Sequence, residues 1–209
     1  MLQFNQVYKT YDQQAILEIN DLTLERSIYW LQGAIGSGKT TFLNMLAGLI
    51  PFRGEILLEG INLCKNPLGY RRLVNSAEAE PSYPDFITGS ELVRFYQDIR
   101  SAAQVQIDML EDLFKMHHFL SKPIGTYSSG MVKKLSLLLA FIGRPTLILL
   151  DEPLATLDEN AIHMIPDLIG AYHKEFRTSF IFSSHQSFKT YSLEINKILV
   201  SNQSLQLIP

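Results

Sequence analysis

The chain has 209 residues, with 18 basic and 21 acidic side chains and a formal net charge of −3. Its 46% hydrophobic and 19% charged residues supply the apolar content of a folded domain, which excludes a disordered chain. The slightly acidic balance and the lack of a long basic run argue against nucleic acid as a partner.

The N-terminal part of the chain is predicted to contain mainly strands. Residues Leu2–Tyr8 and Ile16–Leu24 alternate apolar and polar side chains around a polar turn at Asp12–Gln14, a pattern typical of an antiparallel pair. A short apolar strand, Ile28–Leu31, comes next. After a glycine-rich loop, apolar residues at helical spacing predict a helix over Phe42–Leu49.

The middle of the chain changes from strands to helices. A strand at Glu55–Glu59 leads through a loop containing Pro67 to a short strand at Leu73–Val74. Between about 84 and 143, apolar residues recur three and four positions apart, as in amphipathic helices. The expected helices are Glu91–Ile99, Val105–Met116 and Gly130–Ile142. This span predicts a helical sub-domain of about 84–143, inserted into a core of residues 1–83 and 144–209.

The C-terminal part returns to strands. Thr146–Leu150 and Ser179–Phe182 are continuous apolar runs, which is typical of parallel strands covered on both faces. A helix from Asp158 to about Lys174 separates them, and a terminal hairpin is expected over 197–208. Together these elements predict one α/β domain over 1–209, with a mixed sheet core and an antiparallel N-terminal β sub-domain.

The segment from Gly33 to Thr40 fits the phosphate-loop motif Gly-x-x-x-x-Gly-Lys-[Ser/Thr], between a predicted strand and a predicted helix. In such a loop, backbone N–H groups point inward at phosphate oxygens, and the helix adds about half a positive charge at its N-terminus. Lys39 is expected at the β and γ phosphates, and the Thr40 hydroxyl on Mg²⁺. The expected nucleotide-contacting residues here are Gly33, Ala34, Ile35, Gly36, Ser37, Gly38, Lys39, Thr40 and Thr41. The segment therefore predicts a P-loop NTPase.

Two acids, Asp151 and Glu152, end the apolar strand at Thr146–Leu150. The carboxyl edge of a parallel sheet is where ligands of open α/β folds bind. Asp151 is the expected second Mg²⁺ partner, and Glu152 the base that polarises the attacking water. A strand that ends in acids is by itself often only a solvated strand end, and the phosphate loop decides in favour of function.

With these motifs, the chain resembles the ATP-binding cassette (ABC) ATPases over essentially its whole length. Tyr127–Met131 is similar to the family signature, usually Leu-Ser-Gly-Gly-Gln, and opens a predicted helix before Asp151. Leu154–Asp158 matches the family's D-loop, and Ser183-Ser184-His185 matches its switch histidine. Each short motif is weak alone, and their order and spacing carry the resemblance.

The resemblance implies further contacts with ATP. His185 would contact the γ phosphate, and Tyr11 would stack on adenine, although Tyr11 also suits an ordinary strand aromatic. In the family, the signature of one subunit closes on nucleotide held by the other, in a head-to-tail dimer. The residues so implied are Ser128, Ser129, Gly130 and Asp158.

Two segments depart from the family pattern. Aligning Glu80-Pro81 with the family places Ala79 where a glutamine, the Q-loop residue, usually ligates Mg²⁺. We therefore expect slow or altered hydrolysis with ATP binding intact. The signature also has Ser129 in place of its first glycine and Met131 in place of glutamine. Met131 favours the exporter-type cassettes.

The resulting functional prediction is an ATPase subunit of an ABC transporter, acting with a separate integral membrane permease. The longest apolar stretch, around Leu135–Ile142, is too short to span a bilayer. The start of the chain lacks a signal-peptide pattern, and the single cysteine suits a reducing compartment, so a cytoplasmic, peripheral location is expected. The permease is expected to dock near Pro81–Phe86, on exposed Tyr83 and Phe86, although the same two aromatics equally suit packing within the helical sub-domain.

Other readings stay open at this point. The dimer is either a homodimer or a heterodimer with another cassette. One alternative function is a soluble, non-transport ABC protein that serves as an assembly or scaffold ATPase. A third is a nucleotide-switched binding module, which Ala79 motivates and which the intact Lys39, Asp151, Glu152 and His185 argue against.

Overall fold

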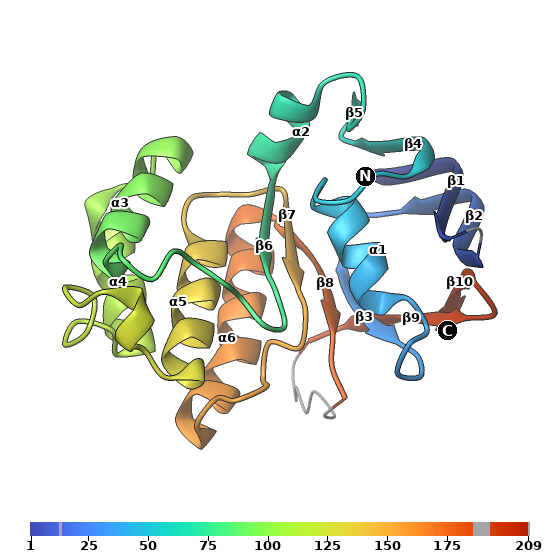
Figure 1. The fold of residues 1–209 in the computed structure, drawn as a ribbon. Coiled ribbons are helices and arrows are strands. Elements are labelled where there is room, and N and C mark those ends of the chain that lie inside the picture. The colour runs from blue at the N-terminus through green and yellow to red at the C-terminus, as the bar shows by residue number, and fades with distance from the viewer. Residues whose placement is uncertain (13, 186–192, 209) are drawn as a thin grey trace.

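The structure is a computed structural model that describes residues 1–12, 14–185 and 193–208 (Figure 1). The strands are β1 (Leu2–Tyr11), β2 (Gln14–Leu24), β3 (Ile28–Gln32), β4 (Arg53–Leu58), β5 (Ile61–Asn62), β6 (Val74–Ala77), β7 (Leu147–Leu150), β8 (Ser179–Ser183), β9 (Ile195–Ser201) and β10 (Ser204–Ile208). The helices are α1 (Lys39–Leu46), α2 (Pro67–Leu73), α3 (Gly89–Arg100), α4 (Gln104–Phe114), α5 (Ser129–Phe141) and α6 (Glu159–Phe176), with a 3₁₀ turn at Ile124–Thr126. Gln13, in the predicted N-terminal turn, lies outside the described residues.

The strands form two sheets. The first is antiparallel, in the order β2-β1-β4-β5, and pairs Leu2 with Leu24 across β1 and β2. The second has the order β10-β9-β3-β8-β7-β6, with β9 to β6 parallel and β10 antiparallel to β9. The mixed core sheet and the antiparallel N-terminal sheet are thus confirmed, and Figure 1 shows the core sheet between helices α3–α6 on one side and α1 with the antiparallel sheet on the other.

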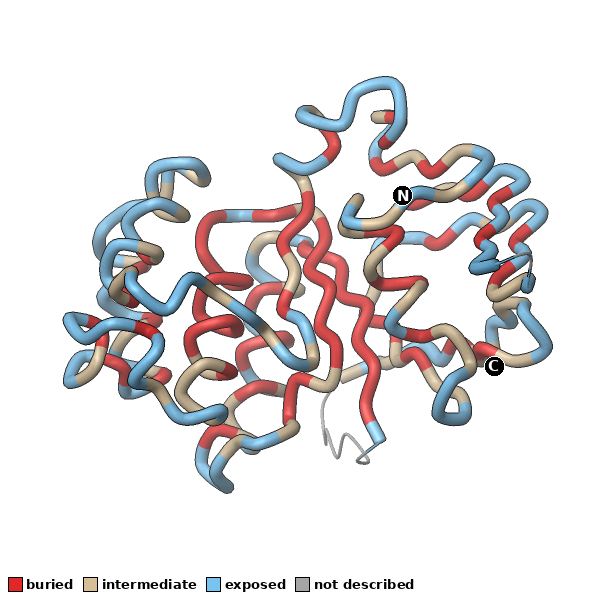
Figure 2. The backbone as a smooth tube through the Cα atoms, in the orientation of Figure 1, coloured by how far each residue is buried: buried red, intermediate tan, exposed pale blue. Residues whose placement is uncertain are grey.

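Both faces of the core sheet are buried. Successive side chains of a strand point to opposite faces, and in β7 Ile148 and Leu150 pack in the cluster with the helices. Leu147 and Leu149 pack in the other cluster, with α1 and the antiparallel sheet. The strands β7 and β8 are accordingly red along their length in Figure 2. This double burial explains the continuous apolar runs in the sequence.

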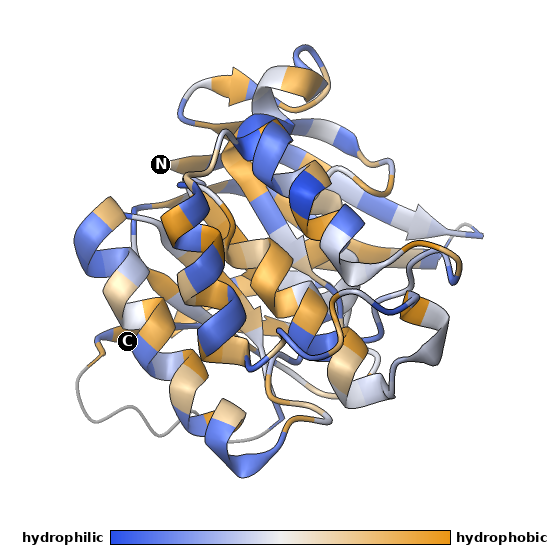
Figure 3. Cartoon of the chain, turned by 90° about the vertical axis from the view of Figure 1, so that its left-hand side faces the viewer, coloured by the Kyte–Doolittle hydropathy of each residue, from blue (hydrophilic) through white to orange (hydrophobic). Residues whose placement is uncertain are grey.

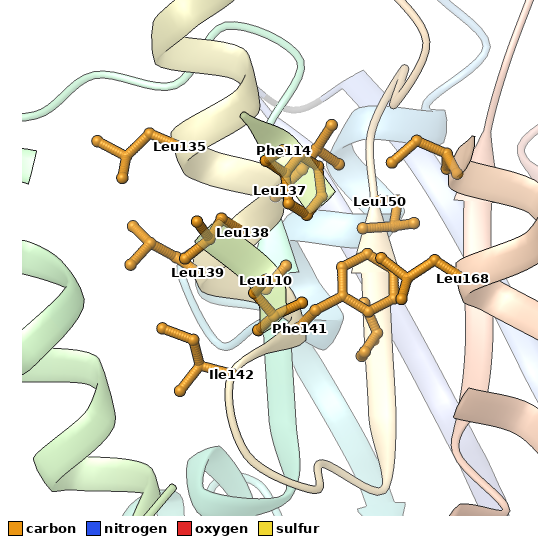
Figure 4. Packing of buried hydrophobic residues seen from close by; sticks show 14 of the residues in the cluster. Leu110, Phe114, Leu135, Leu137, Leu138, Leu139, Phe141, Ile142, Leu150 and Leu168 are labelled. Atoms are coloured by element: carbon orange, nitrogen blue, oxygen red, sulfur yellow. The ribbon is translucent and has the colours of Figure 1, made fainter. Parts of the chain in front are cut away.

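Helix α5 joins the outer helices to the core sheet. It packs against β6 and β7 on one side and against α3 and α4 on the other. In Figure 4, Phe141 points toward Leu150 of β7 and Leu168 of α6, whereas Leu135 and Leu139 point away from that strand. All of these residues belong to one buried cluster. The middle and the end of α5 are therefore packed in the core next to the sheet.

The outer helices present a mixed surface. Figure 3, which views the molecule from the side of α3 and α4, shows hydrophilic and hydrophobic residues interspersed along the helices. Helix α3 begins with a capping box, in which Thr88 accepts from the Glu91 N–H and the Glu91 carboxylate accepts from the Thr88 N–H. Among the described helices, none combines the length and the apolar content needed to cross a bilayer.

The prediction was wrong for the segment before β6. The expected loop around Pro67 is helix α2, and Leu73 ends that helix instead of starting a strand. The Asn66 side chain caps α2 by accepting from the Gly69 N–H at 2.9 Å, and Pro67 occupies the first turn, where its missing N–H costs nothing. The two-residue strand Ile61–Asn62 was not predicted.

Candidate functional site

The loop between β3 and α1 wraps around the start of a helix. Gly33 has φ +155°, and a Cβ there would lie 2.6 Å from the Val200 carbonyl oxygen, so the position accepts only glycine. Gly38 is the N-cap of α1 and has no side chain to cap the first turn. The N–H groups of that turn are thus available to an anion.

The Lys39 ammonium lies inside the loop. The residue is only 8% exposed, and Nζ donates to the Gly33 and Ala34 carbonyl oxygens at 2.8 and 2.9 Å. Phosphate oxygens would give this cation stronger, charge-assisted hydrogen bonds than the two neutral carbonyls. The loop therefore holds one positive charge where the anion is expected.

The two acids at the end of β7 are tied to β8 by one hydroxyl. Ser183 Oγ donates to Asp151 Oδ1 at 2.5 Å and accepts from the Glu152 N–H at 3.0 Å. Asp151 is buried, and its own N–H donates to the Ala77 carbonyl oxygen. Glu152 has φ +45°, an uncommon left-handed conformation for a residue with a side chain. Ser183 thus holds the Asp151 carboxylate and the Glu152 backbone next to β8.

Glu152 faces His185. One carboxylate oxygen, Oε2, accepts from the His185 N–H at 3.2 Å, and the other, Oε1, lies 3.6 Å from His185 Nε2. Oε1 is buried and has no hydrogen-bond partner among the described residues. A buried carboxylate oxygen in this condition can accept a hydrogen bond from a bound water.

A cavity of about 370 Å³ brings these residues together. It is lined by Tyr11, Ile16, Ile35, Gly36, Gly38, Lys39, Thr40, Thr41, Ala79, Asp151, Glu152 and His185. Its size is within the range of small-molecule sites. Tyr11 is 47% exposed, and the Lys9 ammonium lies 4.3 Å from its ring centroid. Segments from five parts of the sequence therefore share one cavity.

The remaining predicted residues do not line this cavity. Gly33, Ala34 and Ser37 lie in the loop itself, and the Ser37 N–H donates to the Ala34 carbonyl oxygen. The others form a second surface, at the starts of α5 and α6, and they are Ser128, Ser129, Gly130 and Asp158.

This second surface is built by contacts between the two helix starts. Ser128 Oγ caps α5 by accepting from the Met131 N–H, and Asp158 caps α6 by accepting from the Ala161 N–H. A Cβ on Gly130 would lie 2.9 Å from the Thr156 carbonyl oxygen, so the segments approach closely. Ser128 and Ser129 are exposed and open to another molecule.

The oxygen atoms at the cavity fit Mg²⁺ only if phosphate oxygens complete its set of ligands. Thr40 and Asp151 line it, and Glu152 adds the unpartnered Oε1. Mg²⁺ favours hard oxygen ligands and is usually held by one or two carboxylates plus substrate phosphates. Among the described residues, no cluster of three or more His, Cys, Asp or Glu side chains forms a metal cage. The donor set thus matches a metal that is bound together with nucleotide.

Sequence reasoning missed the roles of two residues near the acids. Ser183 was noted only as part of the Ser-Ser-His segment, because its place beside Asp151 depends on the pairing of β7 with β8, which the sequence alone does not show. Lys133 is 1% exposed, and its Nζ donates to the Glu78, Ala79 and Asp151 carbonyl oxygens. Burial lowers the pKa of Lys133 to about 8, against the opposing effect of nearby carboxylates. Its spacing of four from Leu137 was the signal for a buried position.

The expected exposure of Tyr83 was wrong. Tyr83 packs against the cluster beneath the helices and hydrogen-bonds Ser136, and burial raises the pKa of its hydroxyl well above the usual value. Its ring is thus occupied by internal packing. Phe86, by contrast, is 83% exposed. Of the two aromatic side chains, only Phe86 is open to a partner.

A larger groove lies elsewhere on the described surface. A groove of about 1270 Å³ runs between the end of α3, α4 and α6, with apolar Val105, Met109 and Phe176 beside Arg72 and Glu175. It includes none of the motif residues described above. The smaller cavity is therefore the candidate site.

Comparison with known proteins identifies relatives of the chain. A family profile described as "ABC transporter" matches residues 19–155. The chain is 28% identical over 178 residues to the "Doxorubicin resistance ATP-binding protein DrrA" of Mycobacterium tuberculosis, a match covering 81% of this chain and 54% of that protein. It is 31% identical over 189 residues to the "ABC transporter ATP-binding protein YtrB" of Bacillus subtilis, covering 89% and 64%. The chain thus spans between half and two thirds of these relatives.

Solved structures share the fold. The "Structure of ATP binding subunit of ABC transporter" superposes with a TM-score of 0.87 at 24% identity, covering 98% of this chain and 88% of that one. The "Dimeric structure of a post-hydrolysis state of the ATP-binding cassette MJ0796 bound to ADP and Pi" gives 0.86 at 19% identity, covering 99% and 97%. At these identities the likeness establishes the fold.

Proposed function

The chain belongs to the ABC transporter family, and on that premise we propose that it binds ATP with Mg²⁺ and hydrolyses ATP to ADP and phosphate. The energy so released powers transport through a separate integral membrane permease. The observation that carries the proposal is the single cavity in which the phosphate loop, Asp151, Glu152 and His185 meet. Neither the loop nor the acids alone would specify hydrolysis.

Each part of the cavity has a task in this reaction. The first-turn N–H groups of α1 and the Lys39 ammonium bind the β and γ phosphates. The Glu152 carboxylate accepts a hydrogen bond from the attacking water through Oε1 and takes its proton. His185, held against Glu152, orients the γ phosphate, and Tyr11 stacks on adenine at the rim. Bond cleavage thus takes place between Glu152 and Lys39.

Thr40 and Asp151 are the residues that would hold Mg²⁺. When bound, this ion would neutralise the negative charge that develops on the phosphates. Ser183 keeps the Asp151 carboxylate in place through the 2.5 Å hydrogen bond, so the aspartate is positioned before the nucleotide arrives.

The second surface serves the neighbouring subunit. We assign Ser128, Ser129, Gly130 and Asp158 to contacts with ATP held by a partner cassette in a head-to-tail dimer. The support is the exposure of Ser128, Ser129 and Asp158, and the absence of all four residues from the lining of the cavity in the same chain. The likeness to a dimeric cassette structure agrees with this arrangement. The partner is a second copy of this chain or another cassette.

The permease is proposed to dock on the helical side of the molecule. The division into a core of 1–83 and 144–209 and a helical sub-domain of about 84–143 belongs to this proposal, as does a peripheral place on the cytoplasmic face of a membrane. Phe86 is the exposed side chain that supports the docking.

The proposed direction of transport is export, supported by Met131 and by similarity to a protein named for doxorubicin resistance.

Two experiments test the two halves of this function. Calorimetric titration with ATP and Mg²⁺ is expected to show one ATP per chain, and the absence of binding would contradict the nucleotide half. For the permease, affinity capture of the tagged chain from detergent-solubilised membranes is expected to recover a polytopic membrane protein. Recovery of soluble partners alone would favour the assembly or scaffold ATPase instead.

Replacing Ala79 with glutamine is expected to raise the turnover number for ATP about fivefold, with little change in ATP affinity. Ala79 lines the cavity, and a glutamine amide there restores an oxygen acceptor near the metal and the water. One added hydrogen bond is worth about 1 kcal/mol, which corresponds to about fivefold. Steady-state phosphate release measures the effect, with the exposed Ala103→Gln as a control. An unchanged turnover number in Ala79→Gln would show that the alanine does not limit the rate.

A further inference from the structure

Lys133 is a buried cation with every donor used. An ammonium has three N–H donors, and those of Lys133 reach the carbonyl oxygens of Glu78 at 2.6 Å, Asp151 at 2.8 Å and Ala79 at 3.3 Å. The residue is 1% exposed, although lysine is rarely buried to this extent. Desolvating a charge is costly, so these three bonds are the compensation for its burial.

The three carbonyls belong to two strand ends at the edge of the cavity. Glu78 and Ala79 directly follow β6, and Asp151 directly follows β7. The two strands pair in parallel, with Ala77 opposite Leu150. Lys133 therefore joins the two backbone segments that carry Ala79 and the acid pair, and both segments line the cavity.

The same lysine is close to the second surface along its own helix. It lies five residues after Ser128, the N-cap of α5, which is about 7.5 Å along a helix axis. The part of α5 that follows Lys133 is packed in the core, so Lys133 lies between the exposed start of the helix and its buried end. Any shift of the helix start on contact with a partner would thus act directly on the Lys133 ammonium and its carbonyls.

We propose that Lys133 is a positioning residue that fixes the ends of β6 and β7 relative to the signature segment at Ser128–Gly130. Through this link the approach of a partner cassette at Ser128–Gly130 sets the placement of Asp151 and Glu152 around the nucleotide. The inference rests on the proposed ATPase function and names a residue that governs the rate of hydrolysis without touching ATP.

Arg100 provides a matched control, because it binds backbone carbonyls at the other end of β6. On α3, its guanidinium donates to the Arg71, Arg72 and Val74 carbonyl oxygens at 3.1, 2.8 and 2.7 Å. It thus makes the same kind of contact as Lys133, three backbone carbonyls bound by one cation, but at the opposite end of β6. Removing Arg100 tests what the loss of such a cluster does to stability alone.

The test compares Lys133→Met, Lys133→Arg and Arg100→Met with the wild-type chain. For each protein, we would measure kcat and KM for ATP, the Kd for the non-hydrolysable analogue AMP-PNP, and the melting temperature. Lys133→Met is expected to lower kcat about ten- to a hundredfold, because small misplacements of reacting groups have effects of this size. Its KM and its Kd for AMP-PNP are expected to stay within about threefold. Lys133→Arg, which keeps a multivalent cation, should recover part of kcat.

Arg100→Met is expected to lower the melting temperature and to leave kcat within about twofold. The inference is overturned if Lys133→Met lowers kcat no more than Arg100→Met does, or if its AMP-PNP affinity falls as much as its kcat. If Lys133→Met does not fold, Lys133→Gln, with two N–H donors, takes its place under the same criteria. A wild-type chain that fails to bind ATP would instead contradict the proposed function, so the two failures are distinct.

Discussion

Replacing Glu152 with glutamine is expected to reduce the rate of ATP hydrolysis by about 10²- to 10⁴-fold while ATP binding is retained. Glutamine keeps the size of the side chain and can still meet the His185 N–H, but it cannot take a proton from water. The buried, unpartnered Oε1 is the atom whose basicity is lost. Steady-state phosphate release with saturating ATP and Mg²⁺ measures the loss.

The control for this change is Glu25→Gln, at an exposed position before β3, which should keep the wild-type rate. Because the proposed dimer forms around intact ATP, Glu152→Gln should also accumulate an ATP-bound pair in size-exclusion chromatography. A variant that hydrolyses ATP at more than about a tenth of the wild-type rate would remove Glu152 from the role of base. A variant that stays monomeric with ATP would count against closure of two copies.

Replacing Lys39 with methionine is expected to weaken ATP binding at least about 30-fold. Methionine fills the space of the lysine stem, so the loss reports the charge. Lys39 is 8% exposed, and two loop carbonyls already hold its ammonium. The loss of a buried charge pair, here between the ammonium and the phosphates, costs at least about 2 kcal/mol. A loss of 2 kcal/mol corresponds to about 30-fold in the dissociation constant.

Isothermal titration of ATP into the wild-type and Lys39→Met chains measures this difference. Lys65→Met is the matched control, because the Lys65 ammonium is exposed and pairs with Glu55 away from the cavity. It should leave the affinity unchanged. Equal affinity of Lys39→Met and the wild type would show that the loop is not where the phosphates bind.

The sequence was sufficient to predict those parts of the fold and the site that neighbouring residues in the chain determine. The phosphate loop is a continuous motif between a strand and a helix, so its place before α1 follows from about a dozen residues. The acid pair follows an apolar run whose double burial is visible in its composition. The sequence predicted that this run lies in a parallel sheet, but not which strands pair with it. Strand pairing depends on residues far apart in the chain.

What the sequence did not reveal depends on long-range contacts. The bond from Ser183 to Asp151 joins residues 32 positions apart, and the bond from Lys133 to Glu78 joins residues 55 apart. No spacing rule links such pairs. The exposure expected for Tyr83 failed for the same reason, since Tyr83 lies in the loop before α3 and its partner Ser136 lies on α5. The error at α2 was local, and the Asn66 cap before Pro67 was the overlooked signal.

A single-turnover experiment tests the central claim, that this cavity binds ATP and that Glu152 hydrolyses it. Labelled ATP and Mg²⁺ are mixed with an excess of wild-type or Glu152→Gln protein, and the nucleotide retained by each protein is identified over time. We expect both proteins to retain ATP at first, the wild type to convert it to ADP and phosphate, and the variant to keep it intact. Conversion at the same rate in both proteins, or persistence of intact ATP in both, would contradict the claim.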